Sequence, residues 1–168
     1  MNPAAPSRFA MAALSEYTRR KERAVLDVAN QRIDRARAER TLAAWLAVAL
    51  LAGADHRDVT AALEPYAAPV PGAESWTDLQ CRAAAASWLA PNRSWAAHLA
   101  HAVTQARTRA EADFTTPAHP DERLSEVEGA SRTARNAASL AHYRALRDLA
   151  AWLGAPAHFE PALEKAAA

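Results

Sequence analysis

Hydrophobic residues along the chain recur every three or four positions, which is the spacing of one face of an α-helix. In residues 8–29, for example, Leu14, Tyr17 and Val28 fall on one side of such a helix. The strict two-residue alternation of a half-buried strand is not sustained in any segment. Valine and isoleucine together number eight, too few β-branched residues to build a sheet. The pattern therefore predicts an all-α fold.

Capping residues, glycine and proline divide this pattern into separate helices. Asp34 and Asp55 are good N-caps for the second and third helices, and Gly53 is placed to close the second. Pro91 and Asn92 interrupt the pattern again. The helices are expected over about residues 8–29, 35–52, 56–65, 77–90, 95–114 and 120–153, with a short tail helix over 161–166.

We expect five to seven helices in one compact, antiparallel, bundle-like domain covering residues 1–168. The short link between the first two helices predicts an N-terminal hairpin over residues 8–52. The proline-containing segment 68–74 is the best candidate for an internal boundary. The residues expected to be largely buried are Leu42, Trp45, Leu46, Leu99, Val103, Leu146, Leu149 and Leu153. Trp152 is also expected in the core, and so are Trp76, Trp88 and Trp95, although these three flank breaks between helices and the alternative is a partly exposed indole that anchors a partner.

The net charge of +1 hides an uneven distribution. Residues 8–40 carry nine Lys or Arg against five Asp or Glu, whereas residues 111–128 carry six acidic residues against one arginine. A basic helical face can contact phosphates, and an acidic face can bind a basic partner. The acids and bases also interleave at helical spacings, which fits an ordinary solvated face equally well. The predicted interaction residues are Arg19, Arg20, Arg23, Arg35 and Arg37 on the basic side, and Glu122, Glu126 and Glu128 on the acidic side.

Reaction-specific motifs are absent from the sequence. With four glycines there is no phosphate-binding loop, and no CxxC, HExxH or GxSxG pattern occurs. Cys81 is the single cysteine, and His98 and His101 are only two ligands, which do not make a metal site. We therefore expect no metal and no cofactor, and we favour a non-catalytic role over an enzymatic one.

The hydropathy of the chain predicts a protein that does not enter a membrane. The longest uncharged apolar run, Leu42 to Ala54, has 13 residues. A membrane-spanning helix needs about 20. The first residues lack the basic stretch and apolar run of a secretory signal. We expect a cytoplasmic location.

One candidate catalytic pattern lies near the end of the chain. Arg135-Asn136 and His142-Tyr143 share one predicted helical face. This pattern resembles the Arg-x(4–6)-His motif of HEPN domains, all-helical bundles that often act as ribonucleases in toxin and defence systems. The resemblance implies that His142 acts as an acid or base and that Arg135 stabilises phosphate charge, usually at a dimer interface. The alternative is a solvated helix face.

The first hairpin carries a second resemblance. Its turn reads Arg32-Ile33-Asp34, and its second helix begins with Ala36, Ala38, Glu39, Arg40 and Leu42. Residues 15–49 resemble in this way the small uncharacterised helical-hairpin proteins of phages and mobile elements. Asn30-Gln31 stand where those proteins have a turn glycine. The resemblance implies an origin in a mobile element rather than an activity.

These features together predict a non-catalytic protein that binds a macromolecule. It would act as an inhibitor or accessory subunit of a protein or nucleoprotein complex, with nucleic acid as a partner for the basic hairpin. The alternative is an HEPN-like ribonuclease or toxin that acts through Arg135 and His142. A homodimer is left open in both cases.

Overall fold

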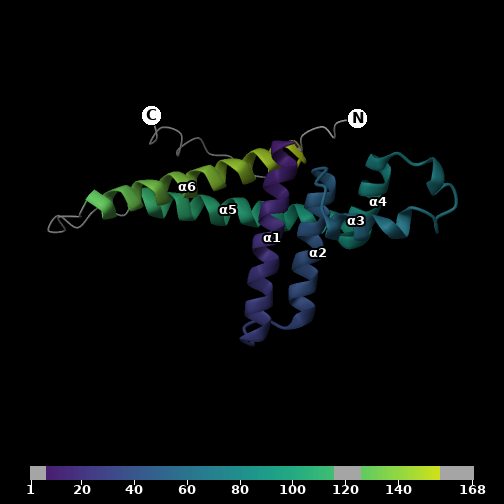
Figure 1. Ribbon diagram of the computed structural model, residues 1–168, viewed down its shortest axis with the longest axis horizontal. Coiled ribbons are helices and arrows are strands. Elements are labelled where there is room, and N and C mark those ends of the chain that lie inside the picture. Colours follow the sequence, from purple (N-terminus) through teal and green to yellow (C-terminus); the bar gives the residue numbers. More distant parts are fainter. Residues whose placement is uncertain (1–6, 116–125, 156–168) are drawn as a thin grey trace. The chain divides into compact units, whose positions relative to one another are not determined.

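The computed structural model describes residues 7–115 and 126–155, with side chains for residues 7–114 and 129–155. Every regular element in these residues is a helix (Figure 1). This confirms the all-α, bundle-like fold expected from the sequence, and the number of helices falls in the expected range. The α-helices are α1 (Arg8–Ala29), α2 (Arg35–Leu51), α3 (Arg57–Leu63), α4 (Asp78–Leu89), α5 (Ser94–Thr115) and α6 (Glu126–Trp152), and the short 3-10 helices are η1 (Glu64–Tyr66), η2 (Ala73–Ser75) and η3 (Pro91–Arg93).

The chain divides into two compact units, Met1–Leu99 and Ala100–Ala168. The division falls inside α5, and the segment 68–74 lies within the first unit. A single domain over the whole chain stays a prediction.

Local residues fix the start of α1 and both ends of α2, and two of them, Asp34 and Gly53, were predicted from the sequence. The Ser7 hydroxyl accepts a hydrogen bond from the Ala10 amide (3.1 Å), and the Asp34 carboxylate accepts one from the Arg37 amide (2.6 Å). Gly53, with a φ of +76°, ends α2 in a left-handed conformation. These local signals explain why α1 and α2 begin and end close to where the pattern predicted.

The N-cap of α3 is a correction to the sequence prediction. His56, not Asp55, caps this helix, and its Nδ1 atom accepts a hydrogen bond from the Asp58 amide at 3.2 Å. Asp55 lies one residue too early to reach an orphan amide of the first turn.

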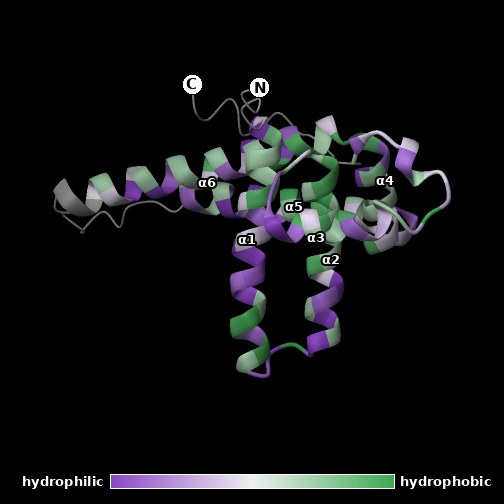
Figure 2. Ribbon diagram, turned by 45° about the vertical axis from the view of Figure 1, so that its right-hand side comes forward, coloured by the Kyte–Doolittle hydropathy of each residue, from purple (hydrophilic) through white to green (hydrophobic). Residues whose placement is uncertain are grey.

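The core of the first unit is built around α2, which packs against both α1 and α4. Its alanines let the neighbouring backbones come close, while Trp45 and Leu50 are fully buried. Figure 2 shows hydrophilic residues in the hairpin arms, over the middle of α1 and the first turns of α2, whereas the end of α1 nearest the turn is partly hydrophobic. The buried residues of α2 are Ala38, Ala44, Trp45, Ala47, Val48, Ala49 and Leu50.

The second unit contains α6 and most of α5. Ser139 of α6 donates a hydrogen bond to the carboxylate of Asp113 in α5. Gly129 lies inside α6, which is continuous from Glu126 to Trp152. The expected helical turn at Pro120–Glu122 and the tail helix at 161–166 lie outside the described residues. The buried residues include Ala102, Val103, Ala106 and Ala110 of α5 and Leu140, Tyr143, Leu146, Leu149 and Ala150 of α6.

The predicted core is mostly correct, with two wrong tryptophans. Trp152 is 52% exposed. The inward-facing side of α6 runs through Leu149 and continues at the half-buried Leu153, so Trp152 lies at its edge and faces solvent. Trp88 is also exposed, because α4 buries Ala85 and Ala86 instead. Of the other expected core residues, Trp45, Trp95, Leu99, Val103, Leu146 and Leu149 are buried, and Leu42, Leu46, Trp76 and Leu153 are half-buried.

Candidate binding surface on the N-terminal hairpin

The α1–α2 hairpin is closed by a tight reversal without glycine. The Gln31 amide donates to the Val28 carbonyl (3.0 Å), and the Arg32 amide donates to the Asp27 carbonyl (2.8 Å). This is the hydrogen-bond pattern of a Schellman motif, in which the residue after the C-cap adopts a left-handed conformation. Gln31 holds that position with a φ of +56°. The turn therefore fixes the direction of α2 at some cost in backbone strain.

Two carboxylates on α1 are each shared by two arginines. Glu16 accepts hydrogen bonds from Arg19 (2.8 Å) and from Arg20 (2.6 Å). Asp27 faces Arg23 at 3.2 Å and Arg32, from the turn, at 3.7 Å. Each cluster therefore keeps one positive charge in excess.

These two clusters lie along one face of α1. Glu16 and Asp27 are separated by eleven residues, or three helical turns, which puts them about 16 Å apart on the same side. Arg19, Arg23 and Arg32 are each more than half exposed, so their guanidinium groups are ordered by the carboxylates and still reach solvent. We call this stripe, from Glu16 to Arg32, the arginine face.

Arg20 differs from the other predicted interaction residues of α1. Its guanidinium lies over the ring of Trp45, with 4.4 Å to the ring centroid, and its side chain is three-quarters covered. Glu16, its carboxylate partner, is 3% exposed. Arg20 therefore anchors α1 on α2 and presents little of its charge to a partner.

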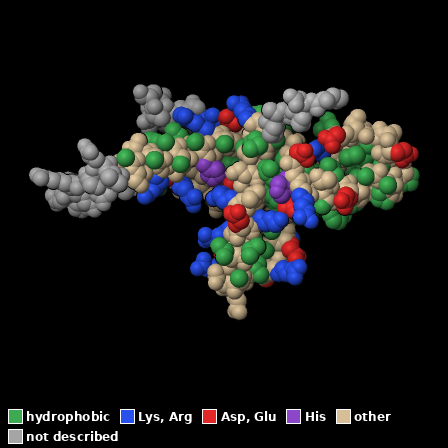
Figure 3. Space-filling view, in the orientation of Figure 1, with side chains coloured by type: hydrophobic (Ala, Val, Ile, Leu, Met, Phe, Trp, Pro, Cys, Tyr) green, Lys and Arg blue, Asp and Glu red, His purple; other side chains and the backbone are tan. Residues whose placement is uncertain are grey.

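The first turns of α2 add positive charge beside the turn. Arg35 is paired with Glu39 at 2.7 Å, an i,i+4 contact that neutralises it. Arg37 and Arg40 are exposed, and no ion pair is formed by either within the described residues. Figure 3 shows Lys and Arg side chains gathered around the two arms of the hairpin.

A polar brace ties the hairpin to α3. The Tyr17 hydroxyl donates to Asp58 Oδ2 (3.1 Å), and Lys21 Nζ donates to the same oxygen (2.6 Å). Burial and this hydrogen bond raise the pKa of Tyr17 to about 12, and the bond from Lys21 is the main cause that lowers the pKa of the Asp58 carboxyl. The brace uses residues 37 and 41 positions apart in the chain to hold α1 in place.

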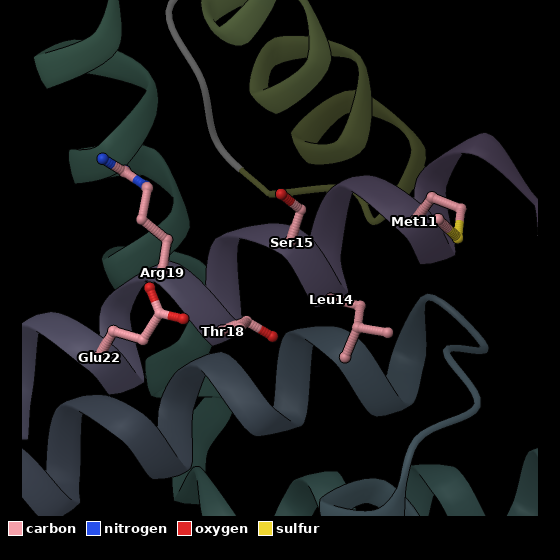
Figure 4. Close-up of a pocket in the computed structure, with 6 residues that line it drawn as sticks. All are labelled: Met11, Leu14, Ser15, Thr18, Arg19 and Glu22. Atoms are coloured by element: carbon pink, nitrogen blue, oxygen red, sulfur yellow. The ribbon is translucent and has the colours of Figure 1, made fainter.

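A shallow hollow of about 380 Å³ runs along α1 beside these charges (Figure 4). Arg19 and Glu22 lie at one end of it and Met11 at the other. Leu14, Ser15 and Thr18 line it between them, so its wall mixes apolar and hydroxyl-bearing side chains. The hollow makes this side of α1 a grooved surface with charge at one end.

The remaining predicted site residues lie elsewhere. Arg135 and His142 are on one face of α6, two turns apart, with Arg135 exposed and His142 half-buried. Glu122 lies outside the described residues, and Glu126 and Glu128 are in the first turn of α6, where side chains are not described. The hairpin residues thus form a surface, whereas the acidic prediction stays untested.

Sequence reasoning missed Arg32 and Arg40 as members of the basic surface. Arg32 reaches Asp27 only because the chain reverses at the turn, and spacing along one helix does not reveal that. Arg40 was visible as an unpaired base one turn after Arg37.

Within residues 7–115 and 126–155 no three His, Cys, Asp or Glu side chains form a group that could hold a metal ion. In the same residues none of the helices is long and apolar enough to span a membrane. Comparisons with protein-family models, curated proteins and solved structures gave no match. The resemblances to hairpin proteins and to HEPN domains therefore stay predictions.

Proposed function

We propose that the chain is a non-catalytic binding protein whose N-terminal hairpin contacts the phosphate backbone of a nucleic acid within a nucleoprotein complex. The observation that carries this proposal is the arginine face of α1, on which Glu16 and Asp27 each hold two arginines. Such a protein would serve the complex as an accessory subunit or inhibit it by occupying its nucleic acid.

The arrangement suits phosphates for two physical reasons. A guanidinium presents its donors in a planar fork that matches phosphate oxygens. Arg19 and Arg23 are already oriented by Glu16 and Asp27, so less side-chain entropy is lost when a phosphate binds. The two clusters span about 16 Å, a length along which a nucleic-acid strand offers more than one phosphate.

Arg37 and Arg40 add exposed positive charge on the first turns of α2 and allow a clean test. The variant Arg37→Glu/Arg40→Glu lowers the net charge from +1 to −3 without breaking an ion pair of the described structure. The variant Arg109→Glu/Arg144→Glu makes the same change on exposed arginines of α5 and α6. Fluorescence anisotropy with a labelled 20-base-pair DNA and a labelled 20-nucleotide RNA compares the two.

The proposal predicts that the hairpin variant loses affinity by on the order of tenfold or more, while the α5–α6 variant binds nearly as the wild type does. Equal losses in both variants would mean that only net charge matters. No binding by the wild-type protein at low salt would remove the proposal.

A second candidate function has one observation in its favour. The hydrogen bond from Ser139 brings the Asp113 carboxylate to α6 between the positions of Arg135 and His142, so an acid joins the face that resembles the HEPN motif. An HEPN-like ribonuclease would lose RNA cleavage in His142→Ala while keeping its helical content. Unchanged cleavage in that variant, or none in the wild type, would leave the binding function alone.

A further inference from the structure

Charge is divided within the first unit itself. The hairpin, residues 8–52, has nine Lys or Arg against five Asp or Glu, all of them within residues 8–40. Residues 53–90, which form α3, η1, η2 and α4, have five Asp or Glu against two arginines. We call this second segment the acidic lobe. Three of its exposed carboxylates form no ion pair within the described residues, and these are Asp55, Glu64 and Glu74.

The exposed large hydrophobic residues of the first unit lie on these same two surfaces. Among its described residues, Met11, Val25 and Leu26 are exposed on α1 of the hairpin, and Leu79 (69%) and Trp88 (67%) are exposed on α4 of the acidic lobe. Figure 3 shows hydrophobic side chains among basic ones on the hairpin, and among acidic ones over the α4 end of the unit. Exposed tryptophans and aliphatic residues within charged surroundings are typical of protein interfaces.

We propose that the acidic lobe of one copy of this chain binds the hairpin of a second copy. The two surfaces carry opposite charge, at +4 for residues 8–40 and −3 for residues 53–90, and each offers apolar side chains to bury. Pairing hairpin with hairpin, or lobe with lobe, would place like charges together, which is unfavourable.

The contact joins two different surfaces, so it either occurs twice in a closed twofold dimer or continues head-to-tail as a ring or an open chain. In each case the associated fraction rises with protein concentration. Because it depends on charge attraction, it weakens at high salt. The proposal does not require the hairpin to bind nucleic acid, although a phosphate backbone would compete for the same arginines.

Sedimentation velocity of the full chain tests the proposal with two charge-reversed variants. The hairpin variant is Arg37→Glu/Arg40→Glu, and the lobe variant is Glu64→Lys/Glu74→Lys; all four residues are exposed and lack ion pairs within the described structure. Wild-type protein should grow in mass with concentration at low salt and revert to a monomer in about 0.5 M salt. Each variant alone should associate on the order of tenfold more weakly or worse.

An equimolar mixture of the two variants should restore binding. The unchanged hairpin of the lobe variant still fits the unchanged lobe of the hairpin variant, so the mixture should form a complex that contains both variants and is stronger than the self-association of either one. Trp88→Ser should weaken wild-type association while circular dichroism stays unchanged, because this side chain is largely exposed.

Three results would overturn the proposal. These are wild-type protein that remains a monomer at every concentration in low salt, variants that associate as strongly as wild type, and a mixture that associates no more strongly than either variant alone. The lobe variant keeps the whole hairpin surface, so its binding to nucleic acid, measured by anisotropy, tests the proposed function separately. Failure of self-association with intact nucleic-acid binding would overturn only the self-association proposal.

Discussion

Replacing Asp58 by asparagine should destabilise the first unit by about 2 kcal/mol at pH 7. The substitution removes the charge that binds Tyr17 and Lys21. A hydrogen bond to a charged group contributes about 1.5–3 kcal/mol. The bond from Tyr17 supplies most of it because Tyr17 is buried, whereas Lys21 is half exposed and its ion pair contributes less.

The pH dependence of this loss has a definite sign. The pKa of Asp58 is lowered in the folded protein, so its contribution is present above the unfolded pKa of about 4 and is lost as the pH falls through the folded value. The difference between wild type and Asp58→Asn should therefore be constant from about pH 5 to 8 and shrink below about pH 4.

Tyr17 gives the matching effect in alkali. Its pKa is raised to about 12, so the neutral hydroxyl stabilises the fold below pH 10, and this contribution is lost as the pH rises from about 10 to about 12. Tyr17→Phe lacks the titrating group and should not show that loss.

Urea unfolding followed by circular dichroism at 222 nm measures both variants across the pH range. Tyr17→Phe is the matched variant: it removes the hydroxyl, and should show most of the same loss at pH 7, while it leaves the contact between Asp58 and Lys21. An Asp58→Asn variant within about 0.5 kcal/mol of wild type at pH 7, or a difference that does not change between pH 3 and 7, would refute the role given to this brace.

Three further tests of the fold use five substitutions. Gln31→Gly should stabilise the protein by about 1 kcal/mol, because glycine relieves the left-handed strain at φ +56°, whereas Gln31→Ala should not; urea midpoints compare them. Leu50→Ala should cost about 2–5 kcal/mol in the same assay, and Trp152→Ala much less, since Leu50 is fully buried and Trp152 is half exposed. Thr77→Ala should cost about 1 kcal/mol, because Thr77 and Gln80 form a capping box at the start of α4, and an unchanged midpoint would contradict that cap.

Local signals in the sequence were enough to predict most helices. The N-caps Ser7 and Asp34 each accept a hydrogen bond from an amide three residues away, and Gly53 ends α2 through its own backbone conformation. These helix ends therefore depend on neighbouring residues and not on contacts between distant parts of the chain. The cap of α3 was wrong because His56 and Asp55 are both polar and adjacent, and only the backbone geometry shows which one reaches an amide.

The binding surface was predictable in outline but not in detail. The excess of arginine in residues 8–40 indicated a basic hairpin. Which arginines are presented depends on packing: Arg20 is covered by its contact with Trp45, and Arg32 joins α1 only through the reversal of the chain. The acidic lobe was missed because its carboxylates are spread singly over residues 53–90 and form no acidic run in the sequence.

The salt dependence of nucleic-acid binding tests the central claim most directly. The proposal assigns phosphate contacts to five exposed arginines of the hairpin, which are Arg19, Arg23, Arg32, Arg37 and Arg40. With five such contacts, the slope of log K against log salt for duplex DNA should be about −4 to −5. Arg37→Glu/Arg40→Glu should reduce that slope by about 2, and Arg109→Glu/Arg144→Glu should leave it unchanged. A wild-type slope near zero, or the same change in both variants, would contradict the account.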